Sequence, residues 1–347
     1  MEYCHMRAKL PGASCYVHSK DCSYPSKTYC MDDTELQLFI RQEIDTRGTH
    51  DVIFSWQDCE LTPERLIFFK SVIELQKKFS QDKKIINTLP INGTLLDDSW
   101  CEFFKENQFL ISVEVDVDIQ PVDKLHNEIS VKSTNHIVEK TVRLLQQHDL
   151  EFQTVTVIDA INSQQPLQVY HYLRNLGSRH MLFIPFLKPL ERGGFEAQSL
   201  SPTALGIFLK TIFYTWIRLD IGTIKIPFFE HTFAAWCGLF VPNCVYAPSD
   251  DSNQATATAM QEIIANQRVE QSQTTRLEEC TRCKVEFACH GGCARESIAL
   301  SQCADPQLNY FCEGYKAFFT YVEPYMLMMR ALWEQSYAPS DIRQYLA

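Results

Sequence analysis

A pattern of five cysteines, spread over 33 residues that also contain Cys303, constrains this chain more than any other feature of its sequence. They are Cys280, Cys283, Cys289, Cys293 and Cys312. A C-x-x-C pair presents two sulfurs on one tight turn, and thiols from further along the chain can complete a set of four soft ligands. Such a set closes a tetrahedral zinc site or holds a 4Fe-4S cluster. The alternative of buried free thiols is disfavoured, because these cysteines lie among polar and glycine residues.

The composition of the whole chain narrows its class. Its 347 residues, 45% of them apolar, suit one large domain and one smaller one. A formal charge of −11, without any lysine or arginine block, argues against nucleic acid as a partner. No apolar run approaches the roughly 20 residues of a membrane span. Fourteen cysteines without a signal peptide predict a cytoplasmic protein whose clustered thiols bind metal instead of forming disulfides.

Between residues 5 and 227 the chain alternates strand-like and helix-like segments. Strands are expected at 5–9, 51–56, 84–89, 109–115, 152–158 and 180–186. Helices are expected at 32–44, from Thr62-Pro63 onward, and at 98–106, 135–148, 166–176 and 204–219. Repeats of this length imply parallel strands joined by right-handed crossovers. The sequence therefore predicts an α/β fold with a partial (β/α)6 barrel.

We place a domain boundary at residue 228. Residues 1–228 are predicted to form the barrel, and residues 229–347 a small cysteine-rich domain that ends in a helix at 315–333. The polar stretch 249–275 reads as a connector. Because parallel sheets bind ligands beyond the carboxyl ends of their strands, we expect the functional residues on one rim. That rim comprises the loops 15–24, 57–61, 90–93 and 116–118.

Several short segments in both predicted domains match one known family. They are Ala8-Lys9 ahead of Gly12-Ala13-x-Cys15, Phe54-x-Trp56-Gln57, Asn92-Gly93-Thr94-Leu95-Leu96-Asp97-Asp98-x-Trp100-Cys101, Pro166-Leu167-Gln168-Val169-Tyr170, Phe183-Ile184-Pro185, the cysteine run, and Asn309-Tyr310-x-Cys312-x-Gly314-Tyr315. On these residues the chain resembles the anaerobic sulfatase-maturating enzymes. They belong to the radical SAM superfamily and carry a C-terminal SPASM domain.

The resemblance implies a radical SAM barrel followed by a SPASM-like iron-sulfur domain. In that family a 4Fe-4S cluster, held in a C-x3-C-x2-C loop after the first strand, passes an electron to S-adenosylmethionine. The resulting deoxyadenosyl radical starts the oxidation of a sulfatase Cys or Ser to formylglycine, and two auxiliary clusters accept the electron. The implied partner is a sulfatase or another protein or peptide client.

The chain departs from the family pattern in the loop that holds the radical cluster. Cys15 and Cys22 keep the outer ligand positions, but Ser19 replaces the middle cysteine. A hydroxyl is a harder and much less acidic ligand than a thiol, so the remaining two thiolates hold a cluster poorly. By resemblance, Cys15 and Cys22 mark a degraded radical SAM cluster.

The loops that bind S-adenosylmethionine in the family also differ. The family's Gly-Gly-Glu-Pro reads Asp58-Cys59-Glu60-Leu61, its Gln-Thr-Asn-Gly reads Pro90-Ile91-Asn92-Gly93, and its Ser-x-Asp-Gly-Pro reads Glu114-Val115-Asp116-Val117-Asp118. Glu60, Asn92 and Asp116 are the residues left at the positions that contact the cofactor. We expect this reduced set to bind S-adenosylmethionine weakly or not at all.

The resemblance divides the C-terminal cysteines between two auxiliary clusters. Cys280, Cys283, Cys289 and Cys312 match a complete ligand set. Cys244 and Cys293 match an incomplete second set, with Asp250 at the spacing of a lost cysteine and Cys303 as a substitute ligand or a free thiol. The family's Cys-Asp-His motif, with its presumed proton acceptor, is missing. The cysteines interpreted as non-ligands are Cys4, Cys30, Cys101 and Cys237.

Two main hypotheses follow, and no catalytic residue is assigned in either. The first is a pseudoenzyme that holds one auxiliary cluster, or zinc, and binds a client as an accessory protein. The second is an active maturase in which His18, Asp21 or Cys59 completes the radical cluster. We favour the first, because cluster ligand, cofactor supports and proton acceptor are lost together. A pure interaction module is a third reading. The metal, the client and the oligomeric state are left open by the sequence.

Overall fold

A computed structural model of the chain describes most of both predicted domains. The described residues are 33–46, 51–56, 60–117, 135–188, 190, 194–239, 278–291 and 309–346. The predicted first strand, the loop 15–24, residues 57–59 and 118, and the connector 249–275 lie outside them. The predictions for those segments therefore stay predictions.

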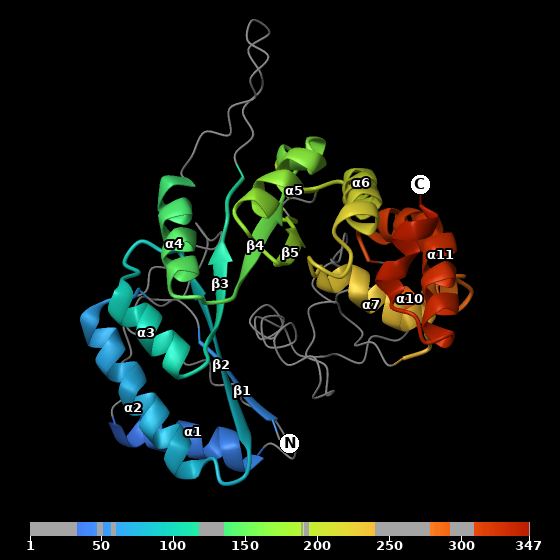
Figure 1. The fold of residues 1–347 in the computed structure, drawn as a ribbon. Coiled ribbons are helices and arrows are strands. Elements are labelled where there is room, and N and C mark those ends of the chain that lie inside the picture. The colour runs from blue at the N-terminus through green and yellow to red at the C-terminus, as the bar shows by residue number, and fades with distance from the viewer. Residues whose placement is uncertain are drawn as a thin grey trace, which may run out of the picture. The chain divides into compact units, whose positions relative to one another are not determined.

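Five strands form one sheet in chain order (Figure 1). They are β1 (Asp51–Ser55), β2 (Lys84–Ile91), β3 (Leu110–Glu114), β4 (Phe152–Ile158) and β5 (His180–Pro185). The pairings of β1 with β2, β2 with β3 and β4 with β5 are parallel. The predicted α/β class with parallel strands in sequential order is confirmed.

The chain divides into two compact units, of which the first contains β1 to β3. Its helices are α1 (Asp33–Thr46), α2 (Pro63–Phe79), α3 (Asp98–Glu106) and α4 (Asn135–Gln147). The Thr62 hydroxyl accepts the Arg65 amide and begins α2, while the Asp97 carboxylate accepts the Trp100 amide at 2.9 Å and begins α3. These caps satisfy amides that a helix leaves unpaired at its start. The predicted beginnings of both helices are confirmed.

A buried polar triad fixes the sheet of the first unit to α2. The Trp56 indole N–H donates to Asn87 Oδ1 at 2.9 Å. Asn87 and Gln76 exchange two further hydrogen bonds, at 2.8 and 2.9 Å. All three side chains are almost fully buried. Every polar atom of the triad thus has a partner in a place that water does not reach, which gives the tryptophan of the Phe54-x-Trp56-Gln57 motif a structural role.

The second unit contains β4, β5 and the C-terminal helices. Its elements are η1 (Asn162–Gln164), α5 (Pro166–Asn175), α6 (Pro202–Leu219), α7 (Pro227–Trp236), α9 (Glu278–Thr281), α10 (Glu286–Cys289), α11 (Cys312–Glu334) and η3 (Pro339–Tyr345). Buried aromatic rings join them, with Phe213, Phe229 and Phe318 in mutual contact at centroid distances of 5.2 to 5.9 Å. None of the described helices is both long and apolar enough to cross a membrane.

Among the longer helices, α7 was not predicted. The β/α repeat was expected to end by residue 228, but α7 begins there, with Pro227 in its first turn. Its buried face includes Phe229 and Trp236. The segment lacks a clear helical period, because both faces of α7 carry aromatic residues. The C-terminal helix also begins three residues earlier than predicted, at Cys312, and continues through Pro324.

We predict that Asn87→Ala lowers the free energy of unfolding by about 3 kcal/mol, because Trp56 and Gln76 then keep buried polar atoms without partners. Urea unfolding followed by tryptophan fluorescence measures this. Asn175→Ala, at an exposed position of α5, is the matched control and should change the value by less than about 1 kcal/mol. Equal effects of the two substitutions would contradict the assignment of the triad.

Candidate metal centre

Four of the five clustered cysteines line one hollow in the second unit. Cys280, Cys283, Cys289 and Cys312 surround a space of about 380 Å³. The first three come from the α9–α10 segment, and the fourth is the first residue of α11. Residues that lie far apart in the sequence therefore meet at one place. The same hollow is also lined by Glu279, Val285, Glu286, Gly291, Asn309 and Lys316.

The first three cysteines are positioned by short turns. The Cys283 amide donates to the Cys280 carbonyl at 3.0 Å, which closes the C-x-x-C turn. The Cys289 amide donates to the Val285 carbonyl at 2.9 Å in the next turn. The segment then ends on His290 and Gly291, both in the left-handed region with φ of 48° and 84°. A left-handed residue ends a helix, and glycine adopts this conformation without strain, so Gly291 lets the chain turn away beside the sulfurs.

A second set of contacts positions Cys312. The Asn309 side-chain oxygen accepts the Phe311 amide at 2.8 Å, and its carbonyl accepts the Cys312 amide at 3.0 Å. Asn309 is buried. This turn starts α11 at Cys312, where the positive end of the helix dipole favours a thiolate. The asparagine and the cysteine of the Asn309-Tyr310-x-Cys312 motif therefore act together.

The glycine at position 314 of the same motif is explained by helix packing. α11 crosses α6 closely at Gly314 and Gly206. A Cβ atom on Gly314 would collide with the carbonyl oxygen of Pro202, and one on Gly206 would lie 3.1 Å from the Gly314 carbonyl oxygen. Only a glycine lets the two helices approach this far. The crossing fixes the first turn of α11, and with it the position of Cys312.

An edge-to-face contact holds the short α10 helix. The rings of Trp236 in α7 and Phe287 in α10 lie 4.7 Å apart at 70°. Isolated helices of one turn are unstable in water, so α10 needs an external contact of this kind. α7, the helix that was not predicted, therefore supports the segment that carries Cys289.

The thiols of Cys280 and Cys312 lose their protons less readily than free cysteines do. Burial raises the pKa of Cys280, and the nearby Cys283 raises it further. Burial also raises the pKa of Cys312, against the opposing effect of the Lys316 ammonium. Several thiolates therefore do not form together here unless a positive group compensates them, as a metal does. Within the described residues, no three His, Cys, Asp or Glu side chains are grouped closely enough to be recognised as the site of one metal ion.

The donor set fits the groups expected from the sequence. Four soft sulfurs, presented by short turns and one helix start, are the ligands that a 4Fe-4S cluster or zinc takes. The structure brings the predicted cysteines to one hollow. It also adds Lys316, which the sequence reasoning missed, and it gives Asn309, known from the sequence only as part of a family motif, a place in the lining. The sequence did carry one signal for Lys316: it lies one helical turn after Cys312, a spacing that puts the two side chains on the same face of a helix.

The other predicted site residues are spread more widely. Glu60 and Asp116 are exposed residues near the carboxyl ends of β1 and β3. Asn92 follows β2, and its side-chain oxygen accepts the Thr94 amide at 3.1 Å and the Thr94 hydroxyl at 2.6 Å. It thus stabilises its own turn. The predicted ligands Cys15, Cys22, Cys244 and Cys293, with Ser19, His18, Asp21, Cys59, Asp250 and Cys303, lie outside the described residues.

The turn after β2 has a structural reason for its glycine. Gly93 has φ of 74°, and a Cβ atom there would collide with the Thr141 side chain. Instead, the Thr141 hydroxyl donates to the Gly93 carbonyl at 3.1 Å. Cys101, interpreted from the sequence as a non-ligand, is fully buried in α3, and burial raises its pKa to about 12. A thiol in that environment stays protonated, as a non-ligand should.

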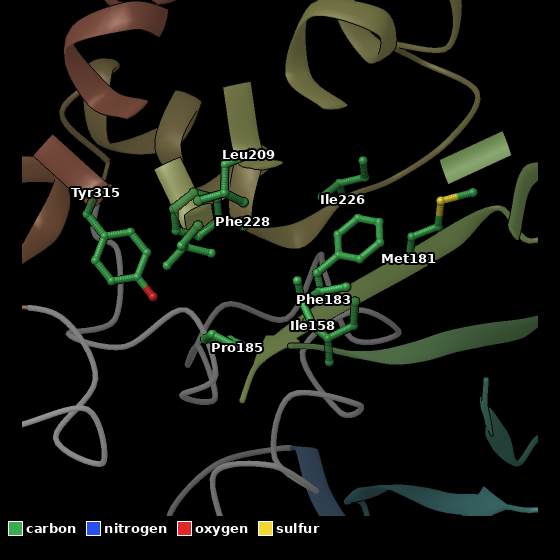
Figure 2. Close-up of a pocket in the computed structure, with 10 residues that line it drawn as sticks. Ile158, Met181, Phe183, Pro185, Leu209, Ile226, Phe228 and Tyr315 are labelled. Atoms are coloured by element: carbon green, nitrogen blue, oxygen red, sulfur yellow. The ribbon is translucent and has the colours of Figure 1, made fainter. Parts of the chain in front are cut away.

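A second hollow, of about 400 Å³, lies at the carboxyl ends of β4 and β5 (Figure 2). Ile158 and Pro185 end the two strands, Leu209 and Phe228 come from α6 and α7, and Tyr315 from α11. In Figure 2 the Tyr315 hydroxyl points toward Pro185. The lining is apolar apart from this hydroxyl. Its place at strand ends is the usual one for ligands of parallel sheets.

Comparison with known proteins places both hollows in a family context. No family model matches the chain. The serine-type anaerobic sulfatase-maturating enzyme of Bacteroides thetaiotaomicron is 27% identical, over 99% of this chain and 95% of that protein. The cysteine-type enzyme of Clostridium perfringens strain 13 is 27% identical, over 90% of this chain and 92% of its own. The structure described as native anSMEcpe with bound AdoMet and Cp18Cys peptide matches with a TM-score of 0.73 and 26% identity, over 93% of this chain and 98% of the other.

The chain is thus similar, over nearly its full length, to the anaerobic sulfatase-maturating enzymes. The similarity runs through both units, and it identifies the parallel sheet as the half-barrel of this family. Identity of about a quarter leaves room for altered sites within a common fold. In this chain the buried Trp56, the Gly93 turn and the α6–α11 crossing give structural roles to motifs that resemble those of the family.

We predict that Gly314→Ala lowers the melting temperature, because the methyl group overpacks the crossing at a cost of about 1 to 3 kcal/mol. An alanine inside an unconstrained helix would instead gain about 1 kcal/mol over glycine, so the sign of the change is diagnostic. Gly206→Ala is the graded control and should cost less, since its methyl meets the neighbouring helix at 3.1 Å. A stabilised Gly314→Ala protein would show that the helices do not meet there.

Proposed function

We propose that this protein no longer cleaves S-adenosylmethionine, holds one auxiliary 4Fe-4S cluster, and acts in the cytoplasm as an accessory protein that binds a sulfatase or a similar client. The observation that carries the proposal is a contrast between two sites. The four auxiliary-type cysteines line one hollow, whereas the loop of the radical cluster has Ser19 where the family motif has a cysteine. The best-preserved metal site is therefore not the one that would generate a radical.

Ser19 weakens the proposed radical site for a chemical reason. In such a cluster three thiolates hold three irons, and the fourth iron is left free to bind the amino and carboxylate groups of S-adenosylmethionine. Cys15 and Cys22 supply two. A serine hydroxyl stays protonated far above neutral pH and is a poor match for iron in such a cluster. The altered loops with Glu60, Asn92 and Asp116 should also weaken the binding of S-adenosylmethionine.

The residues around the second cysteine set support the proposed auxiliary cluster. When bound, such a cluster supplies one-electron redox chemistry. The chain's own part is to hold the sulfurs: the C-x-x-C turn presents Cys280 and Cys283, and the start of α11 presents Cys312. Cys312 is buried and the other three cysteines are half-buried, so the chain shields the site from water only in part, and exposure to water is one of the factors that set a cluster's potential.

The client assignment is supported by a similar structure and by the apolar hollow. The anSMEcpe structure is described as binding the Cp18Cys peptide. In this chain, the hollow at the ends of β4 and β5 offers an apolar lining and the Tyr315 hydroxyl. These features suit an apolar side chain flanked by a peptide group that hydrogen-bonds to the hydroxyl. We propose this hollow as part of the client site.

The first prediction concerns S-adenosylmethionine. After anaerobic reconstitution with iron and sulfide, the protein should carry about four irons per chain and form no 5′-deoxyadenosine above a no-protein blank. A Cys280→Ala, Cys283→Ala double variant should lose this iron, whereas Cys101→Ala, at the non-ligand thiol, should keep it. Deoxyadenosine formation that survives the double variant but not Cys15→Ala would instead establish the active maturase. One zinc per chain and no iron would overturn the proposed cluster.

The second prediction concerns the client. A labelled peptide that contains Cys-x-Pro-x-Arg should bind the iron-loaded protein without S-adenosylmethionine, and a scrambled peptide should not. Tyr315→Phe removes the hydroxyl and keeps the ring, so binding should weaken roughly fivefold through the loss of one hydrogen bond. Tyr337→Phe, at an exposed tyrosine outside the hollow, is the control. Equal affinity of the two variants by fluorescence anisotropy would remove Tyr315 from the client site.

A further inference from the structure

Lys316 is a charged residue that neither the sequence motifs nor the proposed ligand set includes. It lies one helical turn after Cys312 on α11, at the i, i+4 spacing that brings side chains together. It lines the same hollow as the four cysteines. The Lys316 ammonium acts on the Cys312 thiol, because its charge and a hydrogen bond oppose the rise in the pKa of Cys312 that burial causes. The lysine therefore contacts a proposed cluster ligand directly.

The charges around the hollow make this contact important. Among the described residues that line it, the ionisable side chains other than the cysteines are Glu279, Glu286 and Lys316. Lys316 is the one cation of that set. Four thiolates around a 4Fe-4S core add negative charge beside two carboxylates. A fixed positive charge that hydrogen-bonds to sulfur is then the main local compensation that this part of the chain supplies.

We propose that Lys316 is a positioning residue of the auxiliary cluster, which holds the Cys312 sulfur by a charge-assisted hydrogen bond and raises the reduction potential of the cluster. The inference rests on the proposed function, since it requires the cluster at Cys280, Cys283, Cys289 and Cys312. Hydrogen bonds to the sulfurs and net charge are two of the factors that set such potentials. Reduction adds an electron to the cluster, and a nearby ammonium stabilises the more negative state.

Lys284 offers a matched comparison. It follows Cys283 in the chain, is exposed, and is not among the residues that line the hollow. Lys316→Gln and Lys284→Gln remove the same charge from two exposed positions, each close in the chain to a cysteine of the hollow. They differ in whether the ammonium contacts a ligand sulfur. A general effect of surface charge would therefore move both variants alike, and screening by salt would weaken it.

The experiment is a redox titration of the reconstituted full-length protein, followed by electron paramagnetic resonance. The signal of this cluster is assigned by its absence in Cys312→Ala. Lys316→Gln should shift the midpoint potential to a more negative value, by about a tenfold change in the reduction equilibrium, which is about 59 mV for one electron. Lys316→Arg, which keeps the charge and can donate a hydrogen bond, should stay near the wild type, as should Lys284→Gln.

The outcomes separate this inference from the function on which it rests. A wild-type protein without the Cys312-dependent iron signal overturns both proposals. A normal signal with an unchanged potential in Lys316→Gln overturns the role of Lys316 alone, as does an equal shift in Lys284→Gln. If Lys316→Gln takes up no iron, Lys316→Arg decides: retention of both the cluster and its potential supports the proposal, and loss of either rejects it.

Discussion

The close crossing of α11 over α6 is the contact on which the cysteine hollow depends. It requires glycine at residue 314, because the carbonyl oxygen of Pro202 leaves no room for a methyl group. Once this crossing is made, the first turn of α11 has a fixed position, and three of its residues acquire their surroundings. Cys312 and Lys316 line the cysteine hollow, and Tyr315 lines the apolar one. The Asn309-Tyr310-x-Cys312-x-Gly314-Tyr315 motif therefore packs two helices together, and this packing sets the position of Cys312.

Much of the fold could be predicted from the sequence, because local signals and tertiary packing agree along it. The strand β4 and the helix α3 have the predicted bounds, and Thr62-Pro63 begins α2 as expected. α7 could not be found in the same way. Its sequence is aromatic on all sides, and its helical form depends on burial against Phe213 and Phe318, which a periodicity argument does not see.

The sequence predicted the four cysteines that line the hollow, and their role as metal ligands stays a prediction. Cysteine spacing identifies a set of thiols without knowledge of the fold, and the structure brings four of them together. Asn309 is joined to Cys312 by a turn, and Lys316 lies one helical turn after it. Neither residue type alone indicates a metal site in a sequence. The Phe54-x-Trp56-Gln57 and Asn92-Gly93 segments are recognisable from the sequence as family motifs. In the structure, however, Trp56 and Gly93 make packing contacts inside the protein.

The first turn of α11 also couples the proposed cluster site to the proposed client site. Tyr315 lies between Cys312 and Lys316 in the chain, but it faces a different hollow. Any rotation or shift of this turn that improves the sulfur geometry moves the tyrosine hydroxyl as well. Coupling free energy of this kind is reciprocal, so whatever cluster loading does to client affinity, the client does to cluster retention by the same factor. If the proposed cluster and the proposed client bind at these two hollows, such linkage would make client affinity depend on how much iron the protein has taken up.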